Sequence, residues 1–582
     1  MRPASAMLTS ISVHGNPSIS GCTCEEARDS GERKRLRPVD ARPPERWTGA
    51  SHSDQRDEAD PTALNAAAAS ARTGPEDHSG SRRFSVNVLS SVGFITLNVG
   101  LMAWYVPFLV SNLGLAAYGM LALANSLVIY LAVVTDSLNG SVFRYLGIDL
   151  NQGDVRSANR TFNSALILAV LASCLLLVPI AATCYLLPLM FQIPPDLVAG
   201  TRFVLAAVGV TAMTALVGGV FGVSSLIRHR FDLRNIVRSL VALCRIGVVV
   251  LLFAAEPPSL VHVGIGFILA AAIGLAGDVL LWRKLTPELS INPRLIESAR
   301  FRPLIGLSAW SAINVIGVLF IMQVDVIIVN QLLGPEATGR YASILLFPVL
   351  IYTMGEAVLP VLSPAIMAHY ATGNKQALQE LAKRSVRLLA IWLALPIGLL
   401  CGMGAPLLAF WLGPAFADLE TVLLLLVAPL TINLATRPLS YVLTAYNEVK
   451  AQGLVTLALG AANVVLAIAF VRAGLGLAGV PAAAALVWTM RNVLFVSSRS
   501  AVLLGLRWYA FNGHLAIGLL GMAGVAALGR ILCALWWPTG WLSLASFAAV
   551  IALAYGAFAY FVFMTKADRE LVSSVFARRS TS

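Results

Sequence analysis

Two short segments that lie far apart in the chain match each other: LGLAAYG at 113–119 and LGPEATG at 333–339. The same ungapped offset places Asp136 on Glu356, and Gly153 of LNQGDVRSA on Gly373 of YATGNKQAL. Agreement at several separated positions in one frame indicates an internal duplication.

The composition is that of a membrane protein. Of 582 residues, 57% are hydrophobic and only 12% are charged, with a mean hydropathy of +0.77. A helix needs about 20 apolar residues to cross a bilayer, and helices satisfy their own backbone groups there. We therefore predict an all-α polytopic fold. Fourteen candidate spans lie near 86–110, 118–143, 162–187, 203–227, 236–254, 260–282, 304–333, 341–364, 386–412, 421–445, 452–471, 477–497, 512–535 and 541–564.

Residues 1–83 differ from the rest, because they are polar, rich in Arg, Pro and Ser, and lack an apolar period. They predict a disordered cytoplasmic tail, unless translation starts further downstream. The tail holds 12 basic and 12 acidic residues, so the formal charge of +12 belongs to the membrane region and does not indicate nucleic-acid binding. Seven scattered Cys show no metal-ligand spacing, so we predict no metal and no cofactor.

Lys and Arg are distributed unequally between alternate loops. With a cytoplasmic amino terminus, the inner side collects 24 and the outer side four, Arg202, Arg340, Arg472 and Arg530. The positive-inside rule then predicts that both termini are cytoplasmic. Six spans separate the two copies, so we expect two parallel six-helix repeats forming two lobes, with two extra helices. The predicted domains are a tail at 1–83, lobes at 84–284 and 304–508, a cytoplasmic linker at 285–303, two additional spans within 509–565, and a cytoplasmic tail at 566–582.

Several motifs resemble a known family. VDVIIVNQLLGPEATGRYA at 324–342, LVSNLGLAAYGML at 109–121, a glycine in each first inner loop and the fourteen spans resemble the polysaccharide transporter branch of the multidrug/oligosaccharidyl-lipid/polysaccharide (MOP) exporter superfamily. That branch includes Wzx-like flippases for O-antigen and exopolysaccharide. The resemblance covers about residues 84–565.

The resemblance implies a flippase of the bacterial inner membrane. It would translocate an undecaprenyl-pyrophosphate-linked oligosaccharide by alternating access of a V-shaped pair of lobes, coupled to a cation or proton gradient. Its expected partners are the lipid-linked oligosaccharide, membrane lipid and other polysaccharide assembly proteins. A MATE-like drug or cation antiporter and a non-transporting membrane scaffold for glycan assembly are the alternatives. We expect no enzyme activity, because the chain shows no catalytic motif and no long outer loop.

Three acids within or beside spans are candidates for coupling or gating. Asp325 stands inside an apolar run, where a charge is costly unless it has a partner, a wet cavity or a proton. Asp136 and Glu356 occupy equivalent repeat positions. The alternative for Asp325 is a structural hydrogen bond to a neighbouring helix, and Asp136 could simply lie at the inner interface.

Two arginines are candidates for binding the diphosphate headgroup. Of 42 Lys and Arg, only Arg245 and Arg437 are predicted to lie well inside spans. A guanidinium forms forked pairs with phosphate oxygens. Alternatively, each side chain could extend toward the cytoplasmic interface.

Overall fold

The computed structural model of the chain describes residues 78–301, 304, 315–566 and 568–570, which belong to one compact unit. Residues 1–77 of the predicted tail, 305–314 of the seventh predicted span and 571–582 lie outside the described residues. The first described helix, α2, begins at His78, before the predicted boundary at residue 84.

The described residues form helices and no strand, as predicted. The helices before the linker are α2 (His78–Leu113), α3 (Leu115–Ile129), α4 (Ala132–Asn151), α5 (Val155–Met190), α6 (Val198–Ile227), α7 (Phe231–Ala255) and α8 (Leu260–Leu285). Those after it are α10 (Val324–Leu333), α11 (Pro335–Ile344), α12 (Leu346–Ala371), α13 (Lys375–Gly402), α14 (Gly404–Trp411), α15 (Glu420–Val427), α16 (Leu430–Ala435), α17 (Arg437–Ala445), α18 (Val449–Phe470), α19 (Gly479–Met490), α20 (Ser498–Leu503), α21 (Asn512–Leu535) and α22 (Trp541–Phe558).

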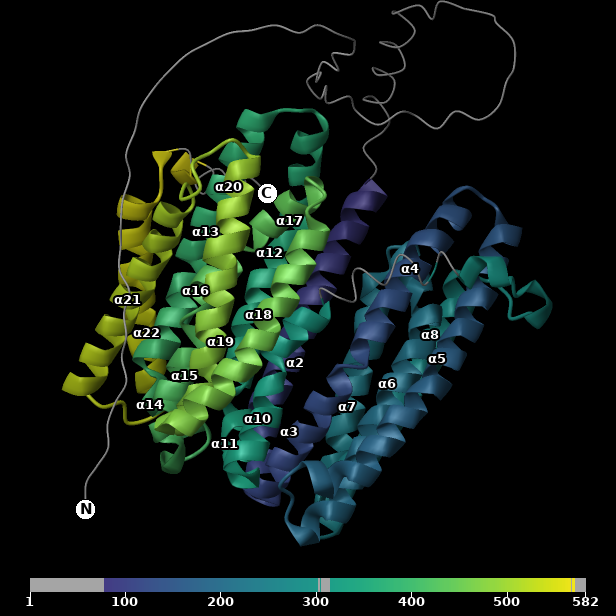
Figure 1. Ribbon diagram of the computed structural model, residues 1–582, viewed down its shortest axis with the longest axis horizontal. Coiled ribbons are helices and arrows are strands. Elements are labelled where there is room, and N and C mark those ends of the chain that lie inside the picture. The colour runs from purple at the N-terminus through teal and green to yellow at the C-terminus, as the bar shows by residue number, and fades with distance from the viewer. Residues whose placement is uncertain (1–77, 302–303, 305–314, 567, 571–582) are drawn as a thin grey trace, which may run out of the picture. The chain divides into compact units, whose positions relative to one another are not determined.

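The number of spans agrees with the prediction. Twelve helical segments of the described residues are long and apolar enough to cross a membrane, and the bent pair α3–α4 makes a thirteenth. One of the twelve, 449–503, has 55 residues and would be about 80 Å long as one straight helix, far more than a bilayer core of about 30 Å. It is broken at Gly474 and Gly476, where φ is 94° and 54°, and α18 packs against α19 (Figure 1). It therefore holds two spans, which brings the number of candidate spans among the described residues to fourteen.

The two predicted inner loops have the same backbone geometry. Gly153 and Gly373 adopt left-handed φ values of 74° and 67°, a conformation that favours glycine. The next residue in each loop, Asp154 or Asn374, caps the following helix. Its side chain accepts a hydrogen bond from the backbone N–H three residues later, at 2.8 and 3.0 Å. This shared geometry at equivalent positions of the repeat frame supports the duplication.

The two matching segments contact each other. Gly114 and Gly334, which precede α3 and α11, have φ values of 78° and 89°. A Cβ added at Gly119 would lie 2.7 Å from the backbone N of Gly339, and one added at Gly339 would lie 2.7 Å from the carbonyl carbon of Leu115. Only glycine at both positions permits this approach of α3 and α11. The repeats thus meet through equivalent residues.

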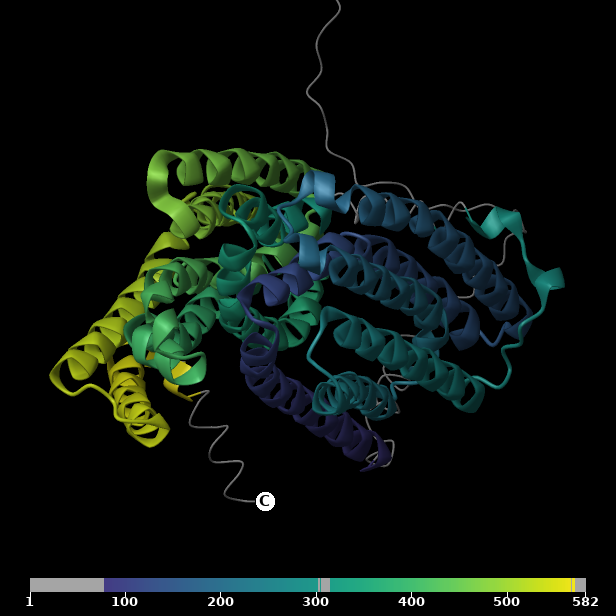
Figure 2. The same ribbon diagram turned by 90° about the horizontal axis from the view of Figure 1, so that it is seen from below.

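Figures 1 and 2 show two groups of helices within this unit. We call α2–α8 the first bundle and α10–α20 the second bundle. A separate core of the first bundle contains Phe162, Phe221 and Trp282, with ring centroids 5.2 to 5.8 Å apart. The added helix α21 packs on α13, and α22 packs on α21. Movement of the bundles as two lobes with the predicted boundaries stays a prediction.

The linker after α8 is tied to α5 by two amide side chains one turn apart. Asn159 donates to the carbonyl of Glu288 at 2.9 Å and accepts from the N–H of Ser290 at 2.7 Å. Asn163 donates to the carbonyl of Ser290 at 2.8 Å and accepts from the N–H of Asn292 at 2.7 Å. These pairs satisfy backbone groups that an extended segment leaves unpaired. The first part of the linker is therefore attached to the first bundle.

A buried acid fastens the chain after the last span. Asp568 is 1% exposed and forms ion pairs with Arg384 at 2.9 Å and Arg387 at 2.5 Å, both on α13. Burial alone would raise the pKa of Asp568, but hydrogen bonds from Thr565 and the two guanidinium groups lower it below its usual value. The segment beyond α22 is thereby attached to the second bundle.

Candidate functional site

A cavity of about 500 Å³ lies inside the first bundle, between α4, α6, α7 and α8. Helix α7 contributes Arg234, Arg238 and Arg245, while α4 contributes Asp136 and α8 contributes Asp278. The arginines are spaced by four and seven residues, so they form one stripe on α7. With three cations and two anions, the cavity carries a net positive charge.

The charged groups of this cavity lie near one another without direct pairing. None of the five side chains makes a hydrogen bond or an ion pair with another residue that the structure describes. A charge within a membrane-spanning bundle is costly unless water, a counter-ion or a ligand compensates it. Unpaired guanidinium groups in such a place can bind an anion through forked hydrogen bonds.

Arg245 lies between this cavity and a smaller one of about 160 Å³, because it lines both. Its guanidinium lies over the ring of Phe267, 5.2 Å from the centroid. Tyr105, Tyr118 and Asn125 also line the smaller cavity. The Tyr105 hydroxyl and the Arg245 Nε are buried without a hydrogen-bond partner among the described residues. Arg245 can therefore donate hydrogen bonds to a ligand.

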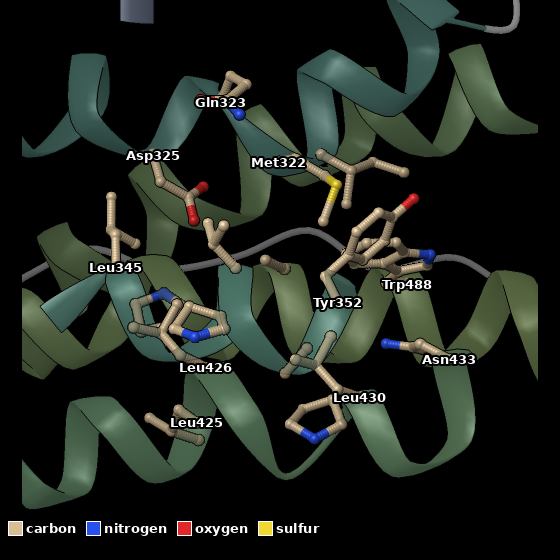
Figure 3. Close-up of a pocket in the computed structure, with 17 residues that line it drawn as sticks. Met322, Gln323, Asp325, Leu345, Tyr352, Leu425, Leu426, Leu430, Asn433 and Trp488 are labelled. Atoms are coloured by element: carbon tan, nitrogen blue, oxygen red, sulfur yellow. The ribbon is translucent and has the colours of Figure 1, made fainter. Parts of the chain in front are cut away.

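Asp325 lies in the first turn of α10 in the second bundle and is 5% exposed. The Tyr341 hydroxyl donates to its Oδ2 at 2.8 Å, as a structural role predicts. Its Oδ1 has no hydrogen-bond partner among the described residues. The carboxylate lines a cavity of about 280 Å³ together with Tyr352 and Asn433 (Figure 3). One oxygen is thus fixed, and the other remains able to bind a proton or a cation.

Glu356 and Arg437, for which the sequence predicts separate roles, form one ion pair. Arg437 Nε donates to Glu356 Oε1 at 2.7 Å, and Nη2 lies 2.5 Å from the same oxygen. Nη2 also donates to the Tyr352 hydroxyl at 3.3 Å. In this arrangement the charge of Arg437 is compensated within the second bundle.

Arg491 is a further cation buried within a candidate membrane-spanning helix, besides the predicted Arg245 and Arg437. Arg491 is 5% exposed and lies between α19 and α20. Its Nε donates to Thr456 Oγ1 at 2.8 Å, and its Nη1 donates to Asn492 Oδ1 at 2.9 Å. Asn492 in turn donates to Asn433 at 2.9 Å. The sequence places Arg491 near the end of the predicted span 477–497 and counts it among the inner-side cations, but the helix continues through it to Leu503.

The predicted site residues fall into three places. Asp136 and Arg245 share the cavity of the first bundle, Glu356 pairs with Arg437, and Asp325 lines the cavity of the second bundle. The structure does not bring the two predicted headgroup residues together, since α7 and α17 lie apart in Figure 1. Sequence reasoning missed Asp278, Arg234 and Arg238 as cavity residues. Two signals in the sequence could have identified them: the helical spacing of Arg234 and Arg238 with Arg245, and the position of Asp278 within a predicted span.

Comparison with known proteins gives the family. No family model matches the chain. The membrane protein EpsK of Bacillus subtilis (strain 168), itself uncharacterized, is 31% identical over 380 residues, which cover 65% of this chain and 75% of EpsK. The chain belongs to the EpsK family.

Solved structures show the fold of this EpsK family member. An inward-facing MATE family multidrug resistance transporter of the MOP superfamily matches with a TM-score of 0.57 and 15% identity, covering 72% of this chain and 98% of the transporter. The lipid II flippase MurJ, in an inward closed conformation, matches with a TM-score of 0.57 and 12% identity, covering 81% and 99%. The chain therefore has the fold of MOP superfamily transporters. These neighbours are transport proteins.

Proposed function

We propose that this EpsK family member is a flippase for undecaprenyl-pyrophosphate-linked oligosaccharide, an O-antigen or exopolysaccharide repeat unit, in the bacterial inner membrane. The observation that carries the proposal is the stripe of Arg234, Arg238 and Arg245, which forms no ion pair with any described residue inside a membrane-spanning bundle. A lipid diphosphate supplies the anionic oxygens that forked guanidinium groups bind. A cationic drug would be repelled by the same net charge.

The fold is compatible with a large lipid-linked substrate, because the lipid II flippase MurJ shares it. We assign the diphosphate to Arg245 together with Arg238 and Arg234. Arg437 is assigned a gating role with Glu356, because its charge is already compensated. Asp136, at the repeat position equivalent to Glu356, is the corresponding gating residue of the first bundle.

The two bundles differ in the charge of their cavities. Tyr105 and Asp325 occupy equivalent positions in the repeat frame that aligns Leu113 with Leu333. Tyr105 lines a cavity with Arg245, whereas Asp325 is the charged residue in the lining of the second bundle's cavity. We infer a division of labour in which the first bundle binds the anionic substrate and the second binds the coupling proton or cation.

Alternating access would use the contact between α3 and α11 as the outer gate. The Gly153 and Gly373 loops lie toward the cytoplasm in this proposal, with both termini inside, because Lys and Arg concentrate on that side. Reporter fusions after Leu150 and Lys375 should then give cytoplasmic signals. A periplasmic signal after Lys375 would reverse the orientation.

The functional proposal is tested by binding of undecaprenyl pyrophosphate to the purified full chain. Arg245→Gln and Arg238→Gln should each weaken binding by roughly 10-fold or more, because each removes a charged hydrogen-bond donor. Arg472→Gln is the matched control, since Arg472 is exposed and outside the cavity. Equal affinity of all three variants and the wild type would contradict the assignment, as would preferential binding of a cationic drug.

A further inference from the structure

The arginine cavity also contains a cluster of hydrogen-bond acceptors against α6. Asp278 on α8 extends toward Gly218 and Gly222, one turn apart on α6. A Cβ at Gly218 would lie 3.2 Å from Asp278 Oδ2, and one at Gly222 would lie 3.1 Å from Oδ1. The two glycines therefore make the space that the carboxylate occupies.

Asn139 on α4 likewise occupies space left by a glycine, Gly219, which lies between Gly218 and Gly222 on α6. A Cβ at Gly219 would lie 2.5 Å from Asn139 Oδ1 and 2.6 Å from its Cγ, so any larger residue would displace the amide. Asn139 Oδ1 is buried and has no hydrogen-bond partner among the described residues. A buried carbonyl oxygen without a donor costs free energy, which a ligand hydroxyl or water can recover.

The lining therefore includes two acceptor groups, Asp278 and Asn139, beside three guanidinium donors. The carboxylate forms no ion pair with the arginines that line the same cavity. An ionised carboxylate only accepts hydrogen bonds and repels a phosphate, so Asp278 weakens a site made for a bare anion. Donors and acceptors kept apart in one cavity suit a ligand that carries both an anion and hydroxyl groups.

We propose that Asp278 and Asn139 bind hydroxyl groups of the sugar attached directly to the diphosphate, while the α7 arginines bind the diphosphate itself. This inference rests on the proposed function and adds a sugar subsite to it. Hydrogen bonds from hydroxyls to a carboxylate are about twice as strong as neutral ones. The subsite would let the protein distinguish a loaded carrier lipid from an empty one, which carries the same anion but no sugar.

The test compares two probes on the full chain in detergent: undecaprenyl pyrophosphate, and the same lipid bearing one hexose. Wild type should bind the sugar-bearing lipid roughly 10-fold or more tighter. Asp278→Ala and Asp278→Asn should lower this ratio toward one and strengthen sugar-free binding, because a repulsive charge is removed. Gly222→Ala, which crowds the carboxylate without deleting it, should also lower the ratio. Asp196→Asn, an exposed acid outside the cavity, is the control.

The possible outcomes distinguish a failure of the sugar subsite from a failure of the proposed function. An equal change in affinity for both lipids in the Asp278 variants would mean that the acid only balances charge, and would overturn the subsite while leaving the flippase proposal intact. Equal binding of both lipids by the wild-type protein would also overturn the subsite and leave the flippase proposal intact. A wild-type protein that binds neither lipid would overturn the proposed function and the subsite together. Retained binding of sugar-free lipid shows that each variant is folded.

Discussion

Replacing Gly339 by Ala should open the contact between the two repeats. The added Cβ would lie 2.7 Å from the carbonyl carbon of Leu115, and still closer to its oxygen, on the facing helix α3. Carbon and oxygen atoms approach to about 3.3 Å at the closest, so α3 and α11 must separate by roughly 1 Å. Neither contacting atom belongs to a flexible side chain, so the strain cannot be relieved by a rotamer change.

The expected size of the effect follows from this overlap. Overpacking of a tight contact costs about 1 to 3 kcal/mol. Only the state in which α3 and α11 touch bears this cost, so the equilibrium between contact and separation should shift by about 5- to 150-fold toward separation. The substitution should not unfold either bundle, because the overlap lies between the bundles.

The assay is the labelling rate of a thiol introduced by Thr338→Cys in a cysteine-depleted protein. Thr338 is 0% exposed beside this contact, so the thiol should react slowly in the parent and faster by the stated factor with Gly339→Ala. Gly100→Ala is the matched control, because a Cβ there meets nothing within 4 Å. An unchanged labelling rate with Gly339→Ala would refute the idea that this glycine contact is an outer gate.

Three further predictions concern charged groups. Asp325→Asn should reduce the dependence of transport on the proton or cation gradient, and a variant with full dependence in a gradient-jump assay would make Asp325 structural. Glu356→Gln and Arg437→Ala should each lower thermal stability, and a double-mutant cycle should give a coupling of about 0.5 to 3 kcal/mol; additive effects would show that the pair contributes nothing. Asp568 has a pKa below its unfolded value, so its stabilisation is present above about pH 4 and lost on further acidification. Melting curves of Asp568→Asn should lack this acid-dependent loss, and identical pH profiles would refute the Asp568 clamp.

The parts of the fold that could be predicted from sequence are those encoded locally. Each predicted span is one apolar run, and the ungapped repeat frame aligns Gly153 with Gly373, whose loops share a backbone conformation in the structure. The contact of Gly119 with Gly339 could not be predicted, because matching positions in a repeat need not touch.

The site was harder to predict, because its residues are far apart in the chain. Hydropathy placed Arg491 near a helix end, whereas its burial depends on the partners Thr456 and Asn492. Asp278 also lies inside a predicted span. Because a charge within a membrane is costly, the argument that singled out Asp325 also applied to Asp278. Helix packing decides which charged side chains lie together, and it places Arg437 beside Glu356 while Arg245 lines the cavity of the first bundle.

Flipping of a defined lipid-linked glycan by the purified chain in sealed vesicles tests the central claim most directly. A fluorescent undecaprenyl-pyrophosphate oligosaccharide in the inner leaflet should become accessible outside at a rate that depends on the protein and on an imposed proton or cation gradient. Arg245→Gln should abolish most of this rate, and Arg472→Gln should preserve it. A wild-type rate equal to that of empty vesicles, or one unaffected by Arg245→Gln, would contradict the account.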